Sequence, residues 1–200
     1  MSAQPTICVV TGAARGIGLA FAQLLVARPD TIVYAGVRSL PLAPSRELGV
    51  LATGHPEVLF PIKITSGDEA DNAAAAATIK ARHGMVHVGI ANAGVSSGLT
   101  PVLQTTAAQM TTDFYINSYG PLLLLQRCSE LLLAAHAASP GSAKFVAVSS
   151  VLGQITEASN FSWTAYGASK AALNVLVKKI NIEMPQVTAF PLHPGTVGTE

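Results

Sequence analysis

A glycine-rich turn near the start of the chain constrains the fold more than any other feature of the sequence. Residues 11–18 read TGAARGIG and lie between the apolar run 7–10 and the apolar stretch 19–26. The short run predicts a strand buried on both faces, and the longer stretch predicts a helix. A strand, a glycine turn and a helix in this order present free backbone N–H groups at the positive end of the helix dipole. The turn therefore predicts a pyrophosphate site, with a helix-capping loop that binds no ligand as the alternative.

The three glycines of this turn have separate uses. Gly12 would let the chain turn off the strand, Gly16 would let the backbone approach the phosphates, and Gly18 would let helix and sheet pack closely. Three residues separate the first two glycines, and Ile17 precedes the third. This spacing resembles the T-G-x-x-x-G-I-G signature of the classical short-chain dehydrogenases/reductases, and the resemblance implies binding of a nicotinamide dinucleotide.

Predicted strands and helices alternate along the rest of the chain. Further strands are expected at 31–37, 58–62, 86–91, 145–148 and 187–190. Helices are expected from Asp68 to about His83, over 107–138 with an interruption near Gly120, and over 165–183, whereas 39–56 reads as a surface connection. This alternation predicts an α/β fold of the Rossmann type, a doubly wound parallel sheet of about six strands in the order 3-2-1-4-5-6 with helices on both faces.

Length and composition favour one domain with much covered apolar surface. A chain of 200 residues can build one well-buried core, so we expect a single domain over 1–200. Charged residues make up 12% and apolar residues 50%. The surplus of apolar residues fits a homodimer or higher homo-oligomer. The family resemblance implies that the leucine-rich helix 122–133 and the helix carrying Tyr166 form the interface, although leucines there could equally be core.

Several functional classes are disfavoured. A net charge of +1 without a basic stripe argues against nucleic acid as a partner. Cys8 and Cys128 form neither a disulfide framework nor a metal pair, so we expect no metal and two buried thiols. The N-terminus lacks a basic region, and the leucine cluster 122–125 is far shorter than the ~20 residues of a membrane span. We therefore expect no membrane association and a cytoplasmic location.

The end of the second predicted strand indicates which dinucleotide is bound. Sites for NAD usually carry an acidic residue there, but this chain has Arg38. With Arg15 from the glycine turn, it would bond a 2′-phosphate, which predicts NADP(H) as the cofactor. Two solvated surface arginines are the alternative. After the third strand, Lys63 and Ile64 replace the acidic residue that touches the adenine in relatives, so the adenine contact stays open.

Two further segments resemble cofactor-binding elements of the family. Residues 92–94 match its N-A-G motif, for which a plain turn is the alternative, and 194–199 resemble its P-G-x-x-x-T segment at the nicotinamide end. The resemblance implies that Val197 offers backbone bonds to the carboxamide and Thr199 its hydroxyl. The cofactor contacts expected in all are Gly12, Arg15, Gly16, Ile17, Gly18, Arg38, Asn92, Ala93, Gly94, Tyr166, Lys170, Pro194, Gly195, Val197 and Thr199.

A tyrosine and a lysine supply candidate acid–base chemistry. Tyr166 and Lys170 are four residues apart on one predicted helix, hence on one face. A neighbouring ammonium and a cationic nicotinamide would favour the phenolate and lower the pKa of Tyr166 from about 10, so that it could exchange a proton near neutral pH. Such a pair is common by chance. Here it follows VSSVLG at 148–153, as the S-S-x-x-G strand end of the family precedes its Y-x-A-S-K motif.

The resemblance implies a role for each residue of the catalytic set. Tyr166 would be the general acid/base, Lys170 would bind the nicotinamide ribose, and Ser150 would hydrogen-bond the substrate carbonyl, with Ser149 as the alternative serine. Asn117, in an N-x-x-G element, would hold a water that links Lys170 to solvent. Three apolar residues would line a substrate pocket, namely Leu152, Phe161 and Trp163. The alternative is that they belong to the core or to an interface.

These features predict an NADPH-dependent oxidoreductase that interconverts a carbonyl group and an alcohol by hydride transfer on a small, apolar molecule. Family members usually continue beyond the point where this sequence stops, through a substrate-covering lid and a seventh strand, and we expect both to be missing. The alternative is therefore a catalytically impaired or non-catalytic remnant that binds NADP(H) and a partner subunit.

Overall fold

A parallel sheet organises the protein. The computed structural model describes residues 4–43, 45–156 and 162–198. Six strands within these ranges form one sheet in the order β3-β2-β1-β4-β5-β6, and every neighbouring pair is parallel. The strands are β1 (Thr6–Thr11), β2 (Thr31–Val37), β3 (Leu59–Lys63), β4 (Val88–Ala91), β5 (Lys144–Val148) and β6 (Thr188–Leu192). The predicted strand order is confirmed.

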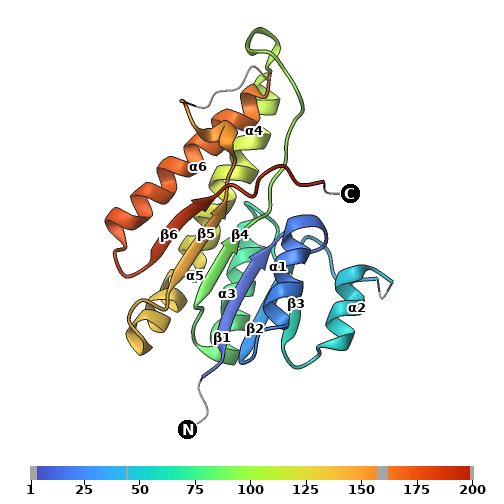
Figure 1. Ribbon diagram of the computed structural model, residues 1–200, viewed down its shortest axis with the longest axis vertical. Helices are drawn as coiled ribbons and strands as arrows, with labels where there is room; N and C mark the ends of the chain where they lie inside the picture. The colour runs from blue at the N-terminus through green and yellow to red at the C-terminus, as the bar shows by residue number, and fades with distance from the viewer. Residues whose placement is uncertain (1–3, 44, 157–161, 199–200) are drawn as a thin grey trace.

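Helices cover both faces of this sheet (Figure 1). The longer helices are α1 (Gly16–Val26), α2 (Glu47–Gly54), α3 (Glu69–His83), α4 (Ala107–Phe114), α5 (Gly120–Ala138) and α6 (Thr164–Glu183). One apolar layer packs α1 and α2 on the sheet, and the other packs α3, α5 and α6 on the opposite face. Among these helices in the described ranges, none combines the length and apolar character needed to cross a membrane.

Local sequence signals explain the limits of α3. The Asp68 side chain accepts a hydrogen bond of 2.8 Å from the Asp71 N–H and so caps the first turn. At the other end, Gly84 adopts a φ of 71° and closes the helix with its own N–H. Both boundaries are as the sequence predicts.

One prediction about the helices is wrong and another is confirmed. Residues 47–54, expected to lie in a surface connection, form α2 because Leu48 is fully buried in the layer between α1 and the sheet. The expected interruption near Gly120 lies just before that residue, in a π turn, η2 (Tyr115–Tyr119). The Ser66 hydroxyl donates to the Ile116 carbonyl at 2.8 Å, which replaces part of the regular helical ladder there.

The two cysteines are packing residues. Cys8 and Cys128 are both free and buried. Burial raises the pKa of the Cys8 thiol and of the Cys128 thiol to about 12, with the Arg28 charge opposing the shift at Cys8. Neither thiol is therefore a nucleophile at neutral pH.

Candidate active site

The glycine turn after β1 has a backbone that requires glycine. Gly12 and Gly16 adopt φ values of 66° and 56°, which side chains rarely tolerate. A Cβ on Gly18 would collide with the Gly12 carbonyl oxygen and would lie 2.6 Å from the Asn92 Nδ2. Gly18 thus lets α1 pack against the turn itself and against the end of β4.

The start of α1 suits an anion. Arg15 stands at the N-cap, its side chain makes no capping hydrogen bond, and the first turn contains no acidic residue. The backbone N–H groups of this turn and the positive end of the helix dipole therefore lack a side-chain acceptor. A diphosphate fits this cradle, in which the glycines leave room for close approach.

Asn92 joins the glycine turn to the end of β4. Its Nδ2 donates to the carbonyl oxygens of Thr11 and Gly12 at 2.9 and 3.4 Å. The Thr11 hydroxyl accepts from the N–H groups of Asn92 and Ala93 at 3.0 and 3.1 Å. The Asn-Ala-Gly segment consequently lies beside the turn. The sequence shows Thr11 only as the first letter of the glycine motif, so its bridging role was missed.

The two arginines predicted to select NADP(H) are available to a ligand. Arg38 directly follows β2, the neighbour of β1 in the sheet, and Arg15 lies in the turn after β1. Both are exposed, and neither forms an ion pair with a residue that the structure describes. The Lys63 ammonium, by contrast, lies 3.0 Å from the Asp71 carboxylate, and Ile64 is buried in the core. Positions 63 and 64 thus offer no acidic group to an adenine.

The structure brings Ser150, rather than Ser149, to Tyr166. Ser150 follows β5 and caps the short helix η3 (Val151–Gly153), where its Oγ accepts from the Leu152 N–H at 3.2 Å. The Ser150 hydroxyl also lies close enough to the Tyr166 phenol to lower its pKa. The Ser149 Oγ is buried and donates to the Asn174 Oδ1 at 2.7 Å. Of the two serines, only Ser150 faces the phenol.

Lys170 and Asn117 complete the group from α6 and η2. Lys170 is 4% exposed, its Nζ donates to the Val148 carbonyl at 2.7 Å, and it lies 5.6 Å from the centre of the Tyr166 ring. Burial lowers the pKa of Lys170 to about 8, and the Asp113 charge opposes this shift. Asn117 is fully buried, and its Nδ2 donates to the Val95 carbonyl at 2.8 Å and to the Ser169 Oγ at 3.0 Å. Both amide hydrogens of Asn117 are therefore used.

The surroundings of Tyr166 shift its pKa. Burial raises it, the nearby Ser150 hydroxyl lowers it, and the Asp113 charge raises it again, with a net shift upward. The shift is upward because the Lys170 ammonium is directed to the Val148 carbonyl rather than to the phenol, so desolvation dominates. The expected lowering of the Tyr166 pKa includes the charge of a cationic nicotinamide, so it stays a prediction for the cofactor-bound protein.

The predicted substrate residues are only partly placed. The Trp163 ring packs edge-on against the Tyr166 ring with centroids 5.5 Å apart, and Leu152 is half-buried in η3. Pro194, Gly195 and Val197 follow β6, and their segment runs from β6 toward the side of the molecule where α1 lies (Figure 1). Phe161 and Thr199 lie outside the described residues.

One residue of this region was missed by sequence reasoning. Asp113 is fully buried in α4, and its charge acts on both Lys170 and Tyr166. A single aspartate in a helix with polar neighbours looks like a solvated residue, and nothing in the local sequence distinguishes it.

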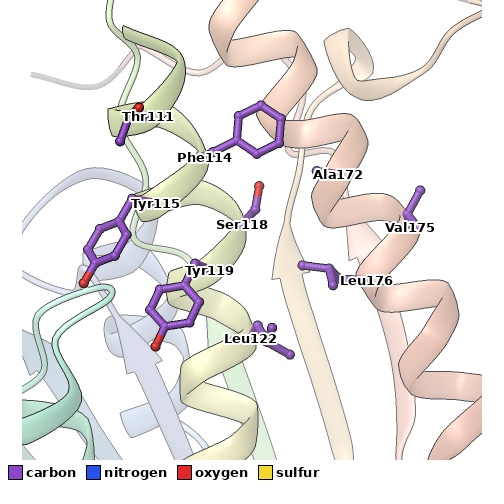
Figure 2. Close-up of a pocket in the computed structure, with 9 residues that line it drawn as sticks. All are labelled: Thr111, Phe114, Tyr115, Ser118, Tyr119, Leu122, Ala172, Val175 and Leu176. Atoms are coloured by element: carbon purple, nitrogen blue, oxygen red, sulfur yellow. The ribbon is translucent and has the colours of Figure 1, made fainter. Parts of the chain in front are cut away.

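An apolar hollow of about 630 Å³ lies apart from these groups, between α6 and the α4–η2–α5 segment (Figure 2). Ser118, at its floor, donates to the Ser169 carbonyl at 2.7 Å. The hollow is lined by Thr111, Phe114, Tyr115, Ser118, Tyr119, Leu122, Ala172, Val175 and Leu176.

Comparison with known proteins agrees with this geometry. A family model described as short chain dehydrogenase matches residues 6–200. Norsolorinic acid ketoreductase of Aspergillus parasiticus is 32% identical over 98% of this chain and 73% of its own length. The NADPH-bound carbonyl reductase from chicken fatty liver superimposes with a TM-score of 0.89 at 30% identity, over 96% of this chain and 80% of that one. The carbonyl reductase Sniffer of D. melanogaster gives 0.86 at 25% identity, over 96% and 81%. The chain belongs to the short-chain dehydrogenase family of oxidoreductases.

Proposed function

We propose that this protein is an NADPH-dependent reductase that converts a carbonyl group to an alcohol, and the reverse, with Tyr166 as the general acid/base. The observation that carries the proposal is the meeting of Ser150, Tyr166 and Lys170 beside Gly94. A Cβ on Gly94 would lie 3.6 Å from the Lys170 Nζ, and the segment of Gly94 is the one that Asn92 joins to the glycine turn. The acid–base group and the anion cradle thus share one edge of the sheet.

The chain's own residues would hold the cofactor at three points. The N–H groups at the start of α1 bind the diphosphate, and Arg15 and Arg38 bind the 2′-phosphate with bidentate, charge-assisted hydrogen bonds. Lys170 binds the ribose next to the nicotinamide. When bound, NADPH supplies the hydride that reduces the substrate carbon. The NADPH named for the chicken carbonyl reductase supports this choice of dinucleotide.

Tyr166 and Ser150 would act on the carbonyl oxygen. Both hydroxyls donate hydrogen bonds to this oxygen, and Tyr166 transfers its proton as negative charge develops there. The upward shift in the pKa of Tyr166 favours the protonated phenol, which suits the direction of reduction. The proton is replaced through Lys170 and a water at Asn117, whose Oδ1 accepts the Val95 N–H at 2.8 Å and retains one lone pair.

The substrate would be a small, apolar carbonyl compound. Trp163 lies directly against Tyr166, and Leu152 follows Ser150 by two residues, so apolar side chains border the reacting oxygen. With Phe161 they would form the substrate pocket. The ketoreductase and carbonyl reductases among the similar proteins support this class of substrate.

We also propose that two copies associate through the hollow of Figure 2. Val175, which lines the hollow, and Ile182, seven residues further along α6, are 63% and 59% exposed although they are apolar. Ile182 therefore extends the apolar lining along one face of α6. A second copy of the same helix would cover both. Light scattering of the purified chain at micromolar concentration should give the mass of a dimer, and a monomer mass would refute the association.

The substitution Tyr166→Phe tests the catalytic proposal. NADPH oxidation is followed with a panel of ketones, aldehydes and quinones, and the variant should lose about 10²–10⁴-fold in kcat while NADPH affinity is retained. Tyr34→Phe is the matched control, because the Tyr34 hydroxyl is buried without a hydrogen-bond partner among the described residues. Full activity of Tyr166→Phe would refute the role of the tyrosine. A wild-type chain that binds NADPH but reduces nothing in the panel would support the non-catalytic alternative.

A further inference from the structure

Three polar residues spaced four apart form a ladder along one face of α4 and η2. Gln109, Asp113 and Asn117 all bond to residues 95–100, the segment that follows the Asn-Ala-Gly motif. Asn117 exchanges two hydrogen bonds with the Val95 backbone, each of 2.8 Å. The Gln109 Nε2 donates to the Ser97 carbonyl at 3.3 Å and to the Thr100 hydroxyl at 2.8 Å. The ladder therefore fixes this segment at both of its ends.

Asp113 is the central and the only ionisable member of the ladder. Its carboxylate is 0% exposed. The Ser97 hydroxyl donates to the Oδ1 at 2.7 Å, and the Ser97 N–H lies 3.1 and 3.3 Å from the two oxygens. Among the described residues the donors to this carboxylate are neutral groups, and in such a buried place the low dielectric strengthens the field of any charge.

That field reaches the acid–base pair. The helices α4 and α6 pack side by side (Figure 1). Within the described residues, the charge of Asp113 acts on Tyr166 and Lys170 of α6 and raises the pKa of both. Asp113 thus favours the protonated phenol and the protonated ammonium together.

The segment 95–100 also contacts the start of α6. The Thr100 N–H donates to the Ser162 carbonyl at 2.5 Å, and the Thr164 hydroxyl donates to the Thr100 carbonyl at 2.9 Å. Thr100 and Trp163 form an isolated parallel bridge, and Trp163 packs against Tyr166. A continuous chain of contacts therefore runs from Asp113 through Ser97 and Thr100 to the tyrosine.

We propose that Asp113 is a positioning residue of the active site, which holds residues 95–100 against the start of α6 and places a fixed negative charge beside Lys170 and Tyr166. The effect of Asp113 on turnover rests on the proposed function, but its effect on the pKa of Lys170 can be measured without turnover.

The isosteric variant Asp113→Asn tests the charge. Lysine labelled with ¹³C at Cε is titrated by NMR, and the Lys170 signal is assigned by its loss in Lys170→Arg. The pKa of Lys170, about 8 in the wild type, should fall in Asp113→Asn. The alkaline limb of the pH profile of kcat for NADPH-dependent reduction should also move to lower pH. At the pH optimum, kcat should fall roughly tenfold, while KM for NADPH stays within about twofold of the wild-type value. Glu130→Gln, an exposed carboxylate paired with Lys80, is the control and should change none of these values.

Ser97→Ala separates position from charge. It removes the 2.7 Å hydrogen bond but leaves the carboxylate, so kcat should fall while the pKa of Lys170 stays as in the wild type. An unchanged pKa of Lys170 in a folded Asp113→Asn variant overturns the electrostatic part of the proposal, whether or not the protein is active. If Asp113→Asn does not fold, full kcat in Ser97→Ala overturns the positioning part. If the wild-type protein reduces no substrate, only the proposed function is refuted, because the NMR titration still measures the effect of Asp113 on the pKa of Lys170.

Discussion

Replacement of Gly18 by alanine should damage the glycine turn in a way that the geometry allows us to estimate. The new Cβ would collide with the Gly12 carbonyl oxygen and lie 2.6 Å from the Asn92 Nδ2. Neither neighbour can swing aside, because one is backbone and the other is held by hydrogen bonds to Thr11 and Gly12. The start of α1 must therefore withdraw from the turn and from the end of β4, as overpacked sites do.

The cost of this withdrawal exceeds the gain from alanine. Overpacking costs about 1–3 kcal/mol, and a strained Asn92 hydrogen bond costs about 1 kcal/mol more. Alanine returns about 1 kcal/mol through its higher helix propensity. The expected net loss in the free energy of unfolding is about 1–3 kcal/mol, or a fall in Tm on the order of 5 °C for a chain of this size.

Chemical denaturation and NADPH titration measure the two consequences of Gly18→Ala. The unfolding midpoint should fall, and NADPH affinity should fall by roughly tenfold because the N–H groups at the start of α1 are displaced. Gly54→Ala is the control: this glycine also lies in the terminal turn of a helix, the last turn of α2, but its Cβ would meet no atom within 4 Å. It should be neutral or stabilising by up to about 1 kcal/mol. A Gly18→Ala variant as stable as wild type with full NADPH affinity would refute the close packing of turn, helix and β4.

Two further predictions concern the serines and the acid stability. Ser150→Ala should reduce kcat by about tenfold or more. Ser149→Ala should chiefly lower stability, since the Ser149 hydroxyl bonds Asn174 rather than the phenol. Equal losses of kcat in the two variants, measured together with melting curves, would contradict this assignment. His87 accepts the Ile7 N–H at its Nδ1 over 2.9 Å, and burial first, then the Lys144 charge, lowers the pKa of His87 below its ordinary 6.5. Because the unfolded chain then binds the proton more readily, stability is fully present above pH 6.5 and is lost as the pH falls below it. Denaturant midpoints between pH 7.5 and 5 should show this loss. It should be smaller in His87→Asn, in which the lowered pKa of His83 remains, and an identical loss in the variant would rule out His87 as its source.

Local signals explain which parts of the fold could be predicted from the sequence. Apolar runs bounded by turn residues define the strands, and right-handed crossovers leave few ways to order parallel strands. Gly12 and Gly16 could be placed because a positive φ is a property of the turn itself. The interruption near Gly120 could be predicted, but its form as a π turn could not, since the Ile116 carbonyl in this turn accepts a hydrogen bond from Ser66, 50 residues away.

The same distinction separates the predicted and missed parts of the site. The sequence left Ser149 and Ser150 open because neighbouring residues on extended backbone point to opposite sides, and only the position of Asn174 decides between them. The burial of Asp113 depends on Ser97, 16 residues earlier in a loop without periodic signal. The upward shift in the pKa of Tyr166 depends on how much protein surrounds the phenol, which no spacing of residues reports.

The most direct test of the account is a titration of the purified chain with NADPH and NADH, in which nicotinamide fluorescence and Tm are followed together. The exposed Arg15 and Arg38 predict tighter binding of NADPH by roughly tenfold or more, as expected for charge-assisted hydrogen bonds to a 2′-phosphate. Arg38→Asp should remove this preference, whereas Arg28→Asp, at the far end of α1, should keep it. Equal affinity for the two dinucleotides, or no binding by a chain that melts cooperatively, would contradict the assignment of the glycine turn and its arginines as an NADP(H) site.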